Sequence, residues 1–260
     1  YPHLIMQYNI SPEMLLPQTM PYNDNTIDEM LSKQIDLSML PAAQVARTPN
    51  GALFRTKKQG FLPKMMQEMY NDRTIYKKKM LIAQQQYEDT KDPKYLNDVS
   101  RYQNIQMARK ISLNSAYGAI GNEWFRYYDL KIAEGITTSG QLSIRWIEKA
   151  LNGYLNKLLK SKEVDYVIAS DTDSVYIRFD ELVNKVLTKR DAESEDSYRL
   201  RVVDFLDKIA KEKIEPFIDN SYQDLASYVN AFDQKMEMGR EAIADKGIWT
   251  AKKRYILNVW

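Results

Sequence analysis

The chain has 260 residues, a formal net charge of +2 and no cysteine. This length allows one or two domains with a sizeable core, and the lack of cysteine excludes disulfide scaffolds and thiolate metal sites. No apolar run approaches the ~20 residues that span a bilayer and no secretory signal opens the chain, so we expect a cytosolic protein without a membrane partner. The chain starts at Tyr1 and ends in what reads as an uninterrupted strand, which indicates a fragment.

The first 59 residues contain six prolines, which interrupt long helices, and only residues 25–40 have room for one. A long amphipathic helix is predicted from Phe61, with Pro63 tolerated in its first turn. A turn at Asp92-Pro93 separates it from a second helix at 94–119. Two helices of ~25 residues joined by a short turn predict a hairpin-shaped arm.

A third helix is predicted at 141–160, after which the apolar period changes from that of a helix to that of strands. Two short strands, 164–169 and 175–179, flank the sequence Ser170-Asp171-Thr172-Asp173-Ser174. This pattern predicts a hairpin with a carboxylate-rich turn.

The last part of the chain predicts a helix at 198–214 that ends before Pro216, followed by strands at 235–244 and 249–260. The expected fold class is α+β, with a sheet-bearing body and an inserted helical arm.

Asp171 and Asp173 are the strongest chemical signal in the sequence. Two carboxylates two residues apart on a hairpin tip can point the same way and share divalent cations, and Mg²⁺ prefers such oxygen ligands. The alternative is a polar β-turn. An EF-hand calcium loop is excluded, because Tyr176 and Leu182 stand where it needs Gly and Glu. Glu241 is a candidate additional carboxylate, with an ordinary salt bridge as the alternative.

The arm supplies a second set of candidate residues. Arg73 and Lys77 lie four residues apart, in line with an apolar stripe. Four more residues share one face of the second helix at three- and four-residue spacing: Lys110, Asn114, Tyr117 and Gly118. Three cations on adjacent helices would clamp a triphosphate, and the amide, ring and glycine would offer a surface for a sugar and base. A solvated helix face is the alternative.

Near the end of the chain, the basic run Lys252-Lys253-Arg254-Tyr255 would contact a nucleic-acid backbone through its phosphates. The alternative is a solvated edge strand, which lysines protect from aggregation. His3 is the only histidine, so sites built on several histidines are excluded.

Four motifs, in this order, resemble those of the family B DNA polymerases, particularly the replicative enzymes of large tailed bacteriophages. Residues 1–5 (YPHLI) and 9–13 (NISPE) are similar to the second half of the first palm motif, D-x-x-S-L-Y-P-S-I-I. Residues 110–118 match the fingers motif K-x-x-x-N-S-x-Y-G. Residues 171–174 (DTDS) match the second metal-binding palm motif, and residues 252–255 match the primer-gripping K-K-R-Y.

The resemblance implies an antiparallel-sheet palm, residues 1–59 and 125–260, with an inserted two-helix fingers arm, residues 60–124. The parent enzyme would add dNTPs to a primer 3′-hydroxyl in DNA replication, with two Mg²⁺ ions, or Mn²⁺ in their place. The implied partners are primer–template DNA, the rest of its own polymerase chain and a sliding clamp, in the host cytoplasm if the source is viral.

The resemblance also implies a role for each candidate residue. Asp173 would bind both metal ions, with Asp171 a nearby and less critical carboxylate. The triphosphate would be held by three cations: Arg73, Lys77 and Lys110. The pocket around the nascent base pair would be shaped by Asn114, Tyr117 and Gly118. Tyr1 would select deoxyribonucleotides by clashing with a 2′-hydroxyl.

Three departures from the family pattern stand out. The family's other essential aspartate would fall five residues before Tyr1, so we expect little or no primer extension from these 260 residues alone. Ala169-Ser170 stands where the family has Tyr-Gly, and serine lacks the backbone freedom of glycine. The region after Ala244 is shorter than expected for the phage enzymes, and no exonuclease or thumb sequence is recognised.

Two other classes of function remain open. A non-catalytic nucleic-acid-binding module would use the basic arm and residues 252–254. A metal-dependent nuclease built on Asp171 and Asp173 would cleave strands without nucleotides, although the cationic face of the arm argues against it.

Overall fold

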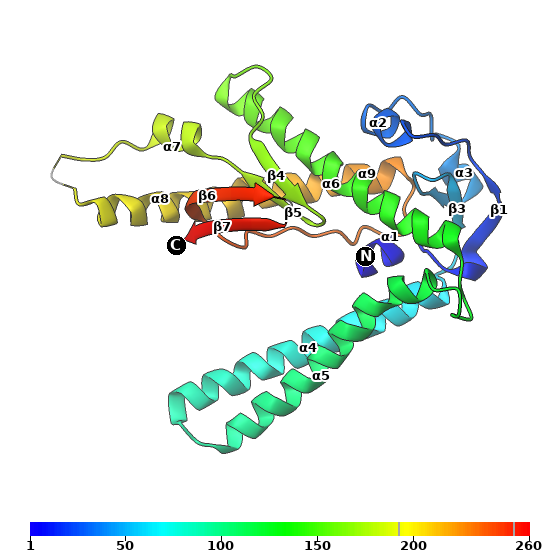
Figure 1. The fold of residues 1–260 in the computed structure, drawn as a ribbon, viewed down its shortest axis with the longest axis horizontal. Helices are drawn as coiled ribbons and strands as arrows, with labels where there is room; N and C mark the ends of the chain where they lie inside the picture. Colours follow the sequence, from blue (N-terminus) through cyan, green and yellow to red (C-terminus); the bar gives the residue numbers. More distant parts are fainter. Residues whose placement is uncertain (192, 252) are drawn as a thin grey trace. The chain divides into compact units, whose positions relative to one another are not determined.

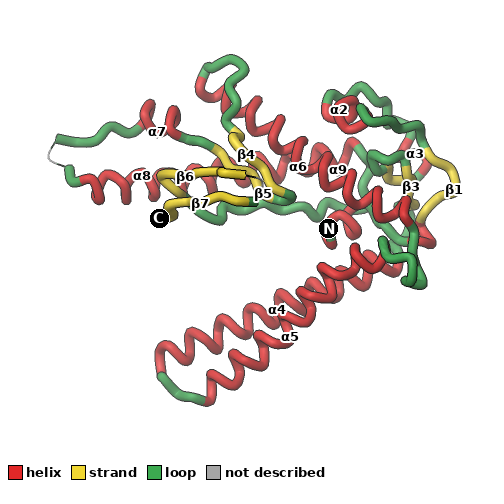
Figure 2. The backbone as a smooth tube through the Cα atoms, viewed as in Figure 1, coloured by secondary structure: helices red, strands yellow, loops and turns green. Residues whose placement is uncertain are grey.

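The computed structural model of the protein describes residues 1–191, 193–251 and 253–260. The chain divides into two units, one formed by Tyr1–Ser139 with Ala226–Lys235 and the other by Gly140–Leu225 with Met236–Trp260. Helices and antiparallel strands both occur in the chain (Figures 1 and 2), which confirms the α+β class. The division into palm and fingers stays a prediction.

The first unit begins with short elements. Its early helices are α1 (Pro2–Gln7), the single 3-10 turn η1 (Pro12–Met14), α2 (Thr26–Leu31) and α3 (Leu40–Ala43). Its strands are β1 (Leu15–Thr19), β2 (Val45–Arg47) and β3 (Ala52–Arg55), which form an antiparallel sheet in the order β1-β3-β2.

This sheet was not predicted from the sequence, and the helix allowed at residues 25–40 is wrong beyond Leu31, where α2 ends. Lys33 has a left-handed backbone (φ 52°), which terminates the helical segment one residue after Ser32 caps α2. The β2–β3 turn depends on Gly51, at φ 77°, where a Cβ would stand 2.2 Å from the Met20 carbonyl oxygen.

Helices α4 (Phe61–Thr90) and α5 (Lys94–Ile120) run side by side and antiparallel, which confirms the predicted helical arm (Figure 1). Lys91, with φ 55°, ends α4. Five of the seven buried residues of the two helices lie toward the end of the arm where α4 begins and α5 ends: Leu62, Pro63, Met66, Leu113 and Ile120. Most of the rest of the arm's surface faces solvent.

The first third of α6 (Leu130–Leu159), up to Ser139, belongs to the first unit. Asn50, in the β2–β3 turn, donates a 2.9 Å hydrogen bond to the Lys131 carbonyl, and the turn lies so close to α6 that a Cβ at Gly135 would be 3.3 Å from the Asn50 amide oxygen. The returning segment is also fastened, because Phe232 donates a 2.8 Å backbone bond to Gln7.

The second unit contains two β-hairpins and several helices. Its strands are β4 (Val167–Asp171), β5 (Ser174–Ile177), β6 (Ala244–Ala251) and β7 (Arg254–Val259), paired β4-β5 and β6-β7. Its further helices are α7 (Asp180–Val186), α8 (Glu195–Ile209), the π-helical turn η2 (Ala210–Ile214) and α9 (Glu215–Tyr228), whose last residues belong to the first unit. The indole nitrogen of Trp146 on α6 donates a 3.0 Å bond to Ser221 on α9, and Tyr154 stacks on Phe217 at 4.4 Å.

Three predicted boundaries are wrong for identifiable reasons. Helix α6 starts at Leu130 rather than at residue 141, because the Asp129 carboxylate caps it by accepting a 3.0 Å bond from Ile132. The helix predicted at 198–214 does not stop before Pro216, because η2 and α9 follow α8 without a break. The π turn η2 shifts the hydrogen-bond register, and Pro216, the second residue of α9, needs no partner for an N–H group. Residues 235–243 form no strand; Arg240 is held instead by Glu215, which accepts a 2.7 Å bond from its backbone N–H.

Of the helices that the structure describes, none has an apolar stretch able to cross a lipid bilayer.

Candidate active site

The predicted carboxylate-rich turn is the tip of the β4–β5 hairpin. Strand pairing extends to Asp171 opposite Ser174, so that the loop contains only Thr172 and Asp173. The Asp173 N–H donates a 2.6 Å bond to the Asp171 carbonyl, and Thr172 adopts φ 54°. A left-handed backbone is unusual for a β-branched residue, so the local strain of this hairpin lies at Thr172.

Ser170, which stands in place of the family's glycine, lies in regular strand structure opposite Val175 and has no positive φ. The missing glycine therefore imposes no backbone strain on the hairpin at this position.

The start of β4 is held by two asparagines one turn apart on α6. The Asn152 side-chain oxygen accepts bonds from the backbone N–H groups of Tyr166 (2.9 Å) and Val167 (3.0 Å). Asn156 binds both backbone groups of Val164, at 3.0 and 2.7 Å. These amides act as a substitute sheet partner for the strand that leads to Asp171.

The hydroxyl of Tyr166, directly before β4, donates a 2.6 Å hydrogen bond to the Glu181 carboxylate. Lys185 contacts Glu181 at 2.7 Å, and this cation together with the Tyr166 hydroxyl lowers the pKa of Glu181. Asp173 lies near a buried phenol: burial raises the pKa of Tyr222, and the negative charge of Asp173 raises it further.

The structure brings the carboxylate hairpin together with the basic β6–β7 hairpin (Figure 1). Tyr176 on β5 packs edge-on against Trp249 on β6, at 5.3 Å, and against Tyr255 on β7, at 5.4 Å. A hydrogen bond to Tyr255 is the largest cause of a raised pKa at Tyr176. Three aromatic rings therefore fix the hairpin that carries Arg254 against the strand that follows the aspartates.

Within the basic run, Lys253 lies in the β6–β7 turn with φ 61°, and Arg254 pairs with Ala251. The side chains of Lys253, Arg254 and Tyr255 are exposed. Lys252 lies outside the described residues.

In the first unit, Tyr1 and Tyr117 meet although they are far apart in sequence. Their ring centroids are 4.6 Å apart with the rings tilted by 32°. Asn114 is exposed, and a Cβ built on Gly118 would meet no atom within 4 Å. The face predicted from helical spacing is therefore open, with an aromatic pair at one edge.

The three predicted cations of the arm are available to a ligand. Arg73 is half-buried, whereas Lys77 and Lys110 are exposed, and no carboxylate among the described residues lies within ion-pairing distance of them. Asp72 pairs instead with Arg109, at 3.2 Å. Because both members of that pair are about half exposed, it contributes little stability, and its consequence is to link the two helices beside the free cations.

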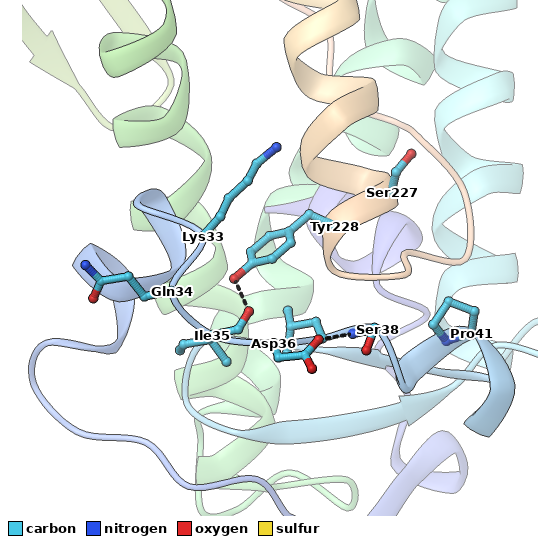
Figure 3. A pocket seen from close by; sticks show the side chains of 9 residues that line it. Lys33, Gln34, Ile35, Asp36, Ser38, Pro41, Ser227 and Tyr228 are labelled. Atoms are coloured by element: carbon cyan, nitrogen blue, oxygen red, sulfur yellow. Dashed lines mark hydrogen bonds between the residues drawn. The ribbon is translucent and has the colours of Figure 1, made fainter.

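A separate cavity of about 420 Å³ lies in the first unit, between the loop after α2 and the end of α9 (Figure 3). Tyr228 donates a 2.9 Å bond to the Ile35 carbonyl at its wall, and Ser38 donates one to the Asp36 carboxylate. None of the residues predicted from the sequence lines this cavity.

The sequence profile described as DNA polymerase family B matches residues 1–192, more than half of the chain. The chain belongs to DNA polymerase family B. It is 33% identical to the DNA-directed DNA polymerase of Enterobacteria phage T4 and 34% identical to that of Escherichia phage RB69, each over the whole chain and 33% of the relative. It is 29% identical to an African swine fever virus protein named DNA polymerase beta, over 68% of the chain and 14% of that relative.

The chain thus spans about a third of the length of its phage relatives. The two phage alignments run over 309 and 313 positions, more than the 260 residues of this chain, so both relatives have insertions opposite it.

Family B polymerases generally use divalent metal ions, and the two hairpin aspartates of this chain are of the chemical type that such ions require. Mg²⁺ is commonly bound through one or two carboxylates, with substrate phosphates and water as further ligands. Asp171 and Asp173 supply such a pair on one tight turn. No group of three or more potential metal-binding side chains meets anywhere in the described residues. Glu241 is exposed in the segment before β6, and its part in metal binding stays a prediction.

Patterns in the sequence did not identify the residues that hydrogen-bond or ion-pair beside the candidate site residues. The available signal was that Asn152 and Asn156 lie four residues apart on α6, each directly after a buried leucine (Leu151 and Leu155). Asp72 gave no signal on its own, because its partner Arg109 lies on the other helix.

Proposed function

We propose that this chain carries the palm and fingers of a template-directed DNA polymerase, which adds dNTPs to a primer 3′-hydroxyl. Family membership over residues 1–192 supports the proposal, because that range includes the arm and both hairpin aspartates. The palm would comprise residues 1–59 and 125–260, and the fingers residues 60–124.

Asp173 and Asp171 would hold the metal ions of the reaction. Bound magnesium would lower the pKa of the attacking 3′-hydroxyl and neutralise charge on the leaving pyrophosphate. The contribution of the protein is to hold the carboxylates in place, which the two-residue loop and the Asn152 hydrogen bonds favour.

The nucleotide would be bound by the arm. Arg73, Lys77 and Lys110 would neutralise the triphosphate, since none of them is occupied by a carboxylate among the residues described. Gly118 and Asn114 would leave room for the nascent base pair. Tyr1, held against Tyr117, would lie under the sugar and exclude a 2′-hydroxyl.

Primer–template DNA would be gripped by residues 252–255 through its phosphates. The exposure of Arg254 and Lys253 and the aromatic anchor at Tyr255 support this role. A sliding clamp is a further proposed partner, suggested by the replicative character of the resemblance alone.

The proposal is tested by Asp173→Asn in the gene product that carries this sequence. Removal of a metal-binding carboxylate should lower Mg²⁺-dependent primer extension by more than about 100-fold while DNA binding is retained. Asp171→Asn should reduce extension less. Asp224→Asn, at an exposed aspartate of α9, is the matched control and should have no effect.

Retention of full extension by Asp173→Asn would refute the polymerase role of this hairpin and favour a non-catalytic nucleic-acid-binding module. Cleavage of DNA with Mg²⁺ in the absence of dNTPs, lost in the same variant, would favour the metal-dependent nuclease.

A further inference from the structure

The N-terminus of α4 is capped in an unusual way, entirely by side chains from another segment. The first N–H groups of a helix lack partners within the helix, and Gly60, at the cap position, has no side chain to supply one. Gly60, Phe61 and Leu62 donate instead to Asn9, Glu13 and Ser11, at 2.8, 2.7 and 3.3 Å. Pro63 has no N–H, and Lys64 returns to the regular helical bond with Gly60.

Asn9 is the fixed part of this cap. It is completely buried, and its left-handed backbone (φ 57°) is one that asparagine tolerates better than most residues. Its amide nitrogen donates to the carbonyls of Arg55 and Lys58, at 2.6 and 2.8 Å, while its oxygen accepts from Gly60. One side chain therefore satisfies three backbone groups across the junction between β3 and α4.

Glu13 is the exposed part of the cap. One carboxylate oxygen accepts from Phe61 and the other accepts a 2.5 Å bond from the Ser11 hydroxyl. Its negative charge lies at the positive end of a 30-residue helix, where it is favourable. Ser11 is buried, and a Cβ on Gly60 would stand 2.6 Å from the Ser11 Cβ, so the close approach requires glycine.

The capping segment directly follows α1, the helix whose first carbonyl belongs to Tyr1. Tyr1 accepts a 3.0 Å backbone bond from Ile5, and His3 on α1 packs edge-on against Tyr70 on α4 at 4.7 Å. Residues 1–13 therefore contact α4 at two levels, at its first turn and at Tyr70, three residues before Arg73.

We propose that Asn9, Ser11 and Glu13 form the pivot that positions the nucleotide-binding arm relative to Tyr1. Asn9 anchors the junction, and Glu13 is a positioning residue that sets the direction in which α4 leaves Gly60. The pivot determines where Arg73 and Lys77 lie with respect to the sugar-contacting tyrosine, an inference that rests on the proposed polymerase function.

The first experiment measures the cap itself and needs no polymerase activity. Hydrogen exchange of the amides in residues 60–66 is compared between the gene product that carries this sequence and its Glu13→Ala, Glu13→Gln and Glu68→Ala variants. Loss of a helix cap should accelerate exchange about fivefold in Glu13→Ala. Glu13→Gln, which keeps an accepting oxygen, should stay close to the parent, as should Glu68→Ala at an exposed glutamate of the same helix.

The second experiment measures nucleotide use by single-turnover primer extension. Glu13→Ala should raise the dNTP concentration at half-maximal rate about fivefold, with partial rescue in Glu13→Gln and no change in Glu68→Ala. A cap with a purely structural role would lower the active fraction or the unfolding midpoint without shifting this concentration.

Unchanged exchange in Glu13→Ala would refute the cap, and faster exchange with an unchanged dNTP dependence would refute the positioning role. Absence of extension by the parent protein would instead count against the proposed function, with the exchange result still valid for the cap.

Discussion

Gly118 is a position of the candidate site where one substitution should raise stability and lower activity. It lies in helix α5, is exposed, and a Cβ built there would meet no atom within 4 Å. A glycine inside a helix costs about 0.5–1 kcal/mol relative to alanine, because its unfolded state has more conformational freedom. The fold of this chain therefore gives no steric reason for a glycine at 118.

Gly118→Ala should consequently raise the free energy of unfolding by up to about 1 kcal/mol, measured by urea denaturation. If the open space belongs to the nascent base pair, the added methyl group should cost binding about 1–3 kcal/mol, which corresponds to a roughly 5- to 150-fold fall in kcat/KM for dNTP incorporation.

Gly153→Ala is the matched control. Gly153 is also exposed and also lies within a helix, and a methyl group added there would likewise meet no atom within 4 Å, but it belongs to α6 and not to the predicted nucleotide face. It should gain a similar free energy of unfolding without loss of kcat/KM. Gly118→Ala with full activity would refute the substrate-facing role of this position, and destabilisation would refute the open geometry around it.

Two further predictions concern the anchoring of the carboxylate hairpin. Asn152→Ala leaves the Tyr166 and Val167 N–H groups without their acceptor and should lower the free energy of unfolding, measured by urea denaturation, by about 1–3 kcal/mol. The control Asn97→Ala, at an exposed asparagine of α5, should change it by less than about 0.5 kcal/mol. Equal effects of the two substitutions would contradict the anchoring role of Asn152. Because the pKa of Glu181 is lowered in the folded state, its ionisation stabilises the fold fully above the ordinary glutamate pKa of about 4.3, and this stabilisation is lost as the pH falls through the lower folded-state pKa. Glu181→Gln should therefore weaken the pH dependence of the unfolding free energy below about pH 4.3. An unchanged pH dependence in this range would show that Lys185 and Tyr166 do not perturb Glu181.

The long helices were predictable because one period repeats through many residues. In α4 and α5 the apolar spacing persists for several turns, and Asp92-Pro93 marks the turn between them. The β4–β5 hairpin was predictable for a related reason, since two β-type runs flank a cluster of turn-forming residues.

The N-terminal sheet could not be predicted in the same way. β2 has three residues, all buried, so it shows no alternation between apolar and polar positions. Pro17, which argued against regular structure, lies in β1 at the edge of the sheet, where a missing N–H is tolerated.

The contact between Tyr1 and Tyr117 was also beyond local patterns, because it joins residues that are 116 positions apart in the sequence. The same holds for Asn9, whose partners Arg55, Lys58 and Gly60 lie more than 45 residues away. Asparagine gives the same local signal whether its amide binds a distant backbone or faces water.

The partners of the polar residues distinguish those needed for folding from those available for chemistry. Asn9 and Asn152 each make three hydrogen bonds with the protein, so their loss leaves backbone or side-chain groups unpaired. Asn114, by contrast, is exposed and its side chain has no hydrogen-bond partner among the described residues, and Lys77 and Lys110 have no carboxylate there. Folding therefore does not require the second group of side chains. Substitutions in the first group should act mainly through stability, and substitutions in the second should act mainly through binding and turnover, so the two kinds of measurement together identify which residues meet substrate.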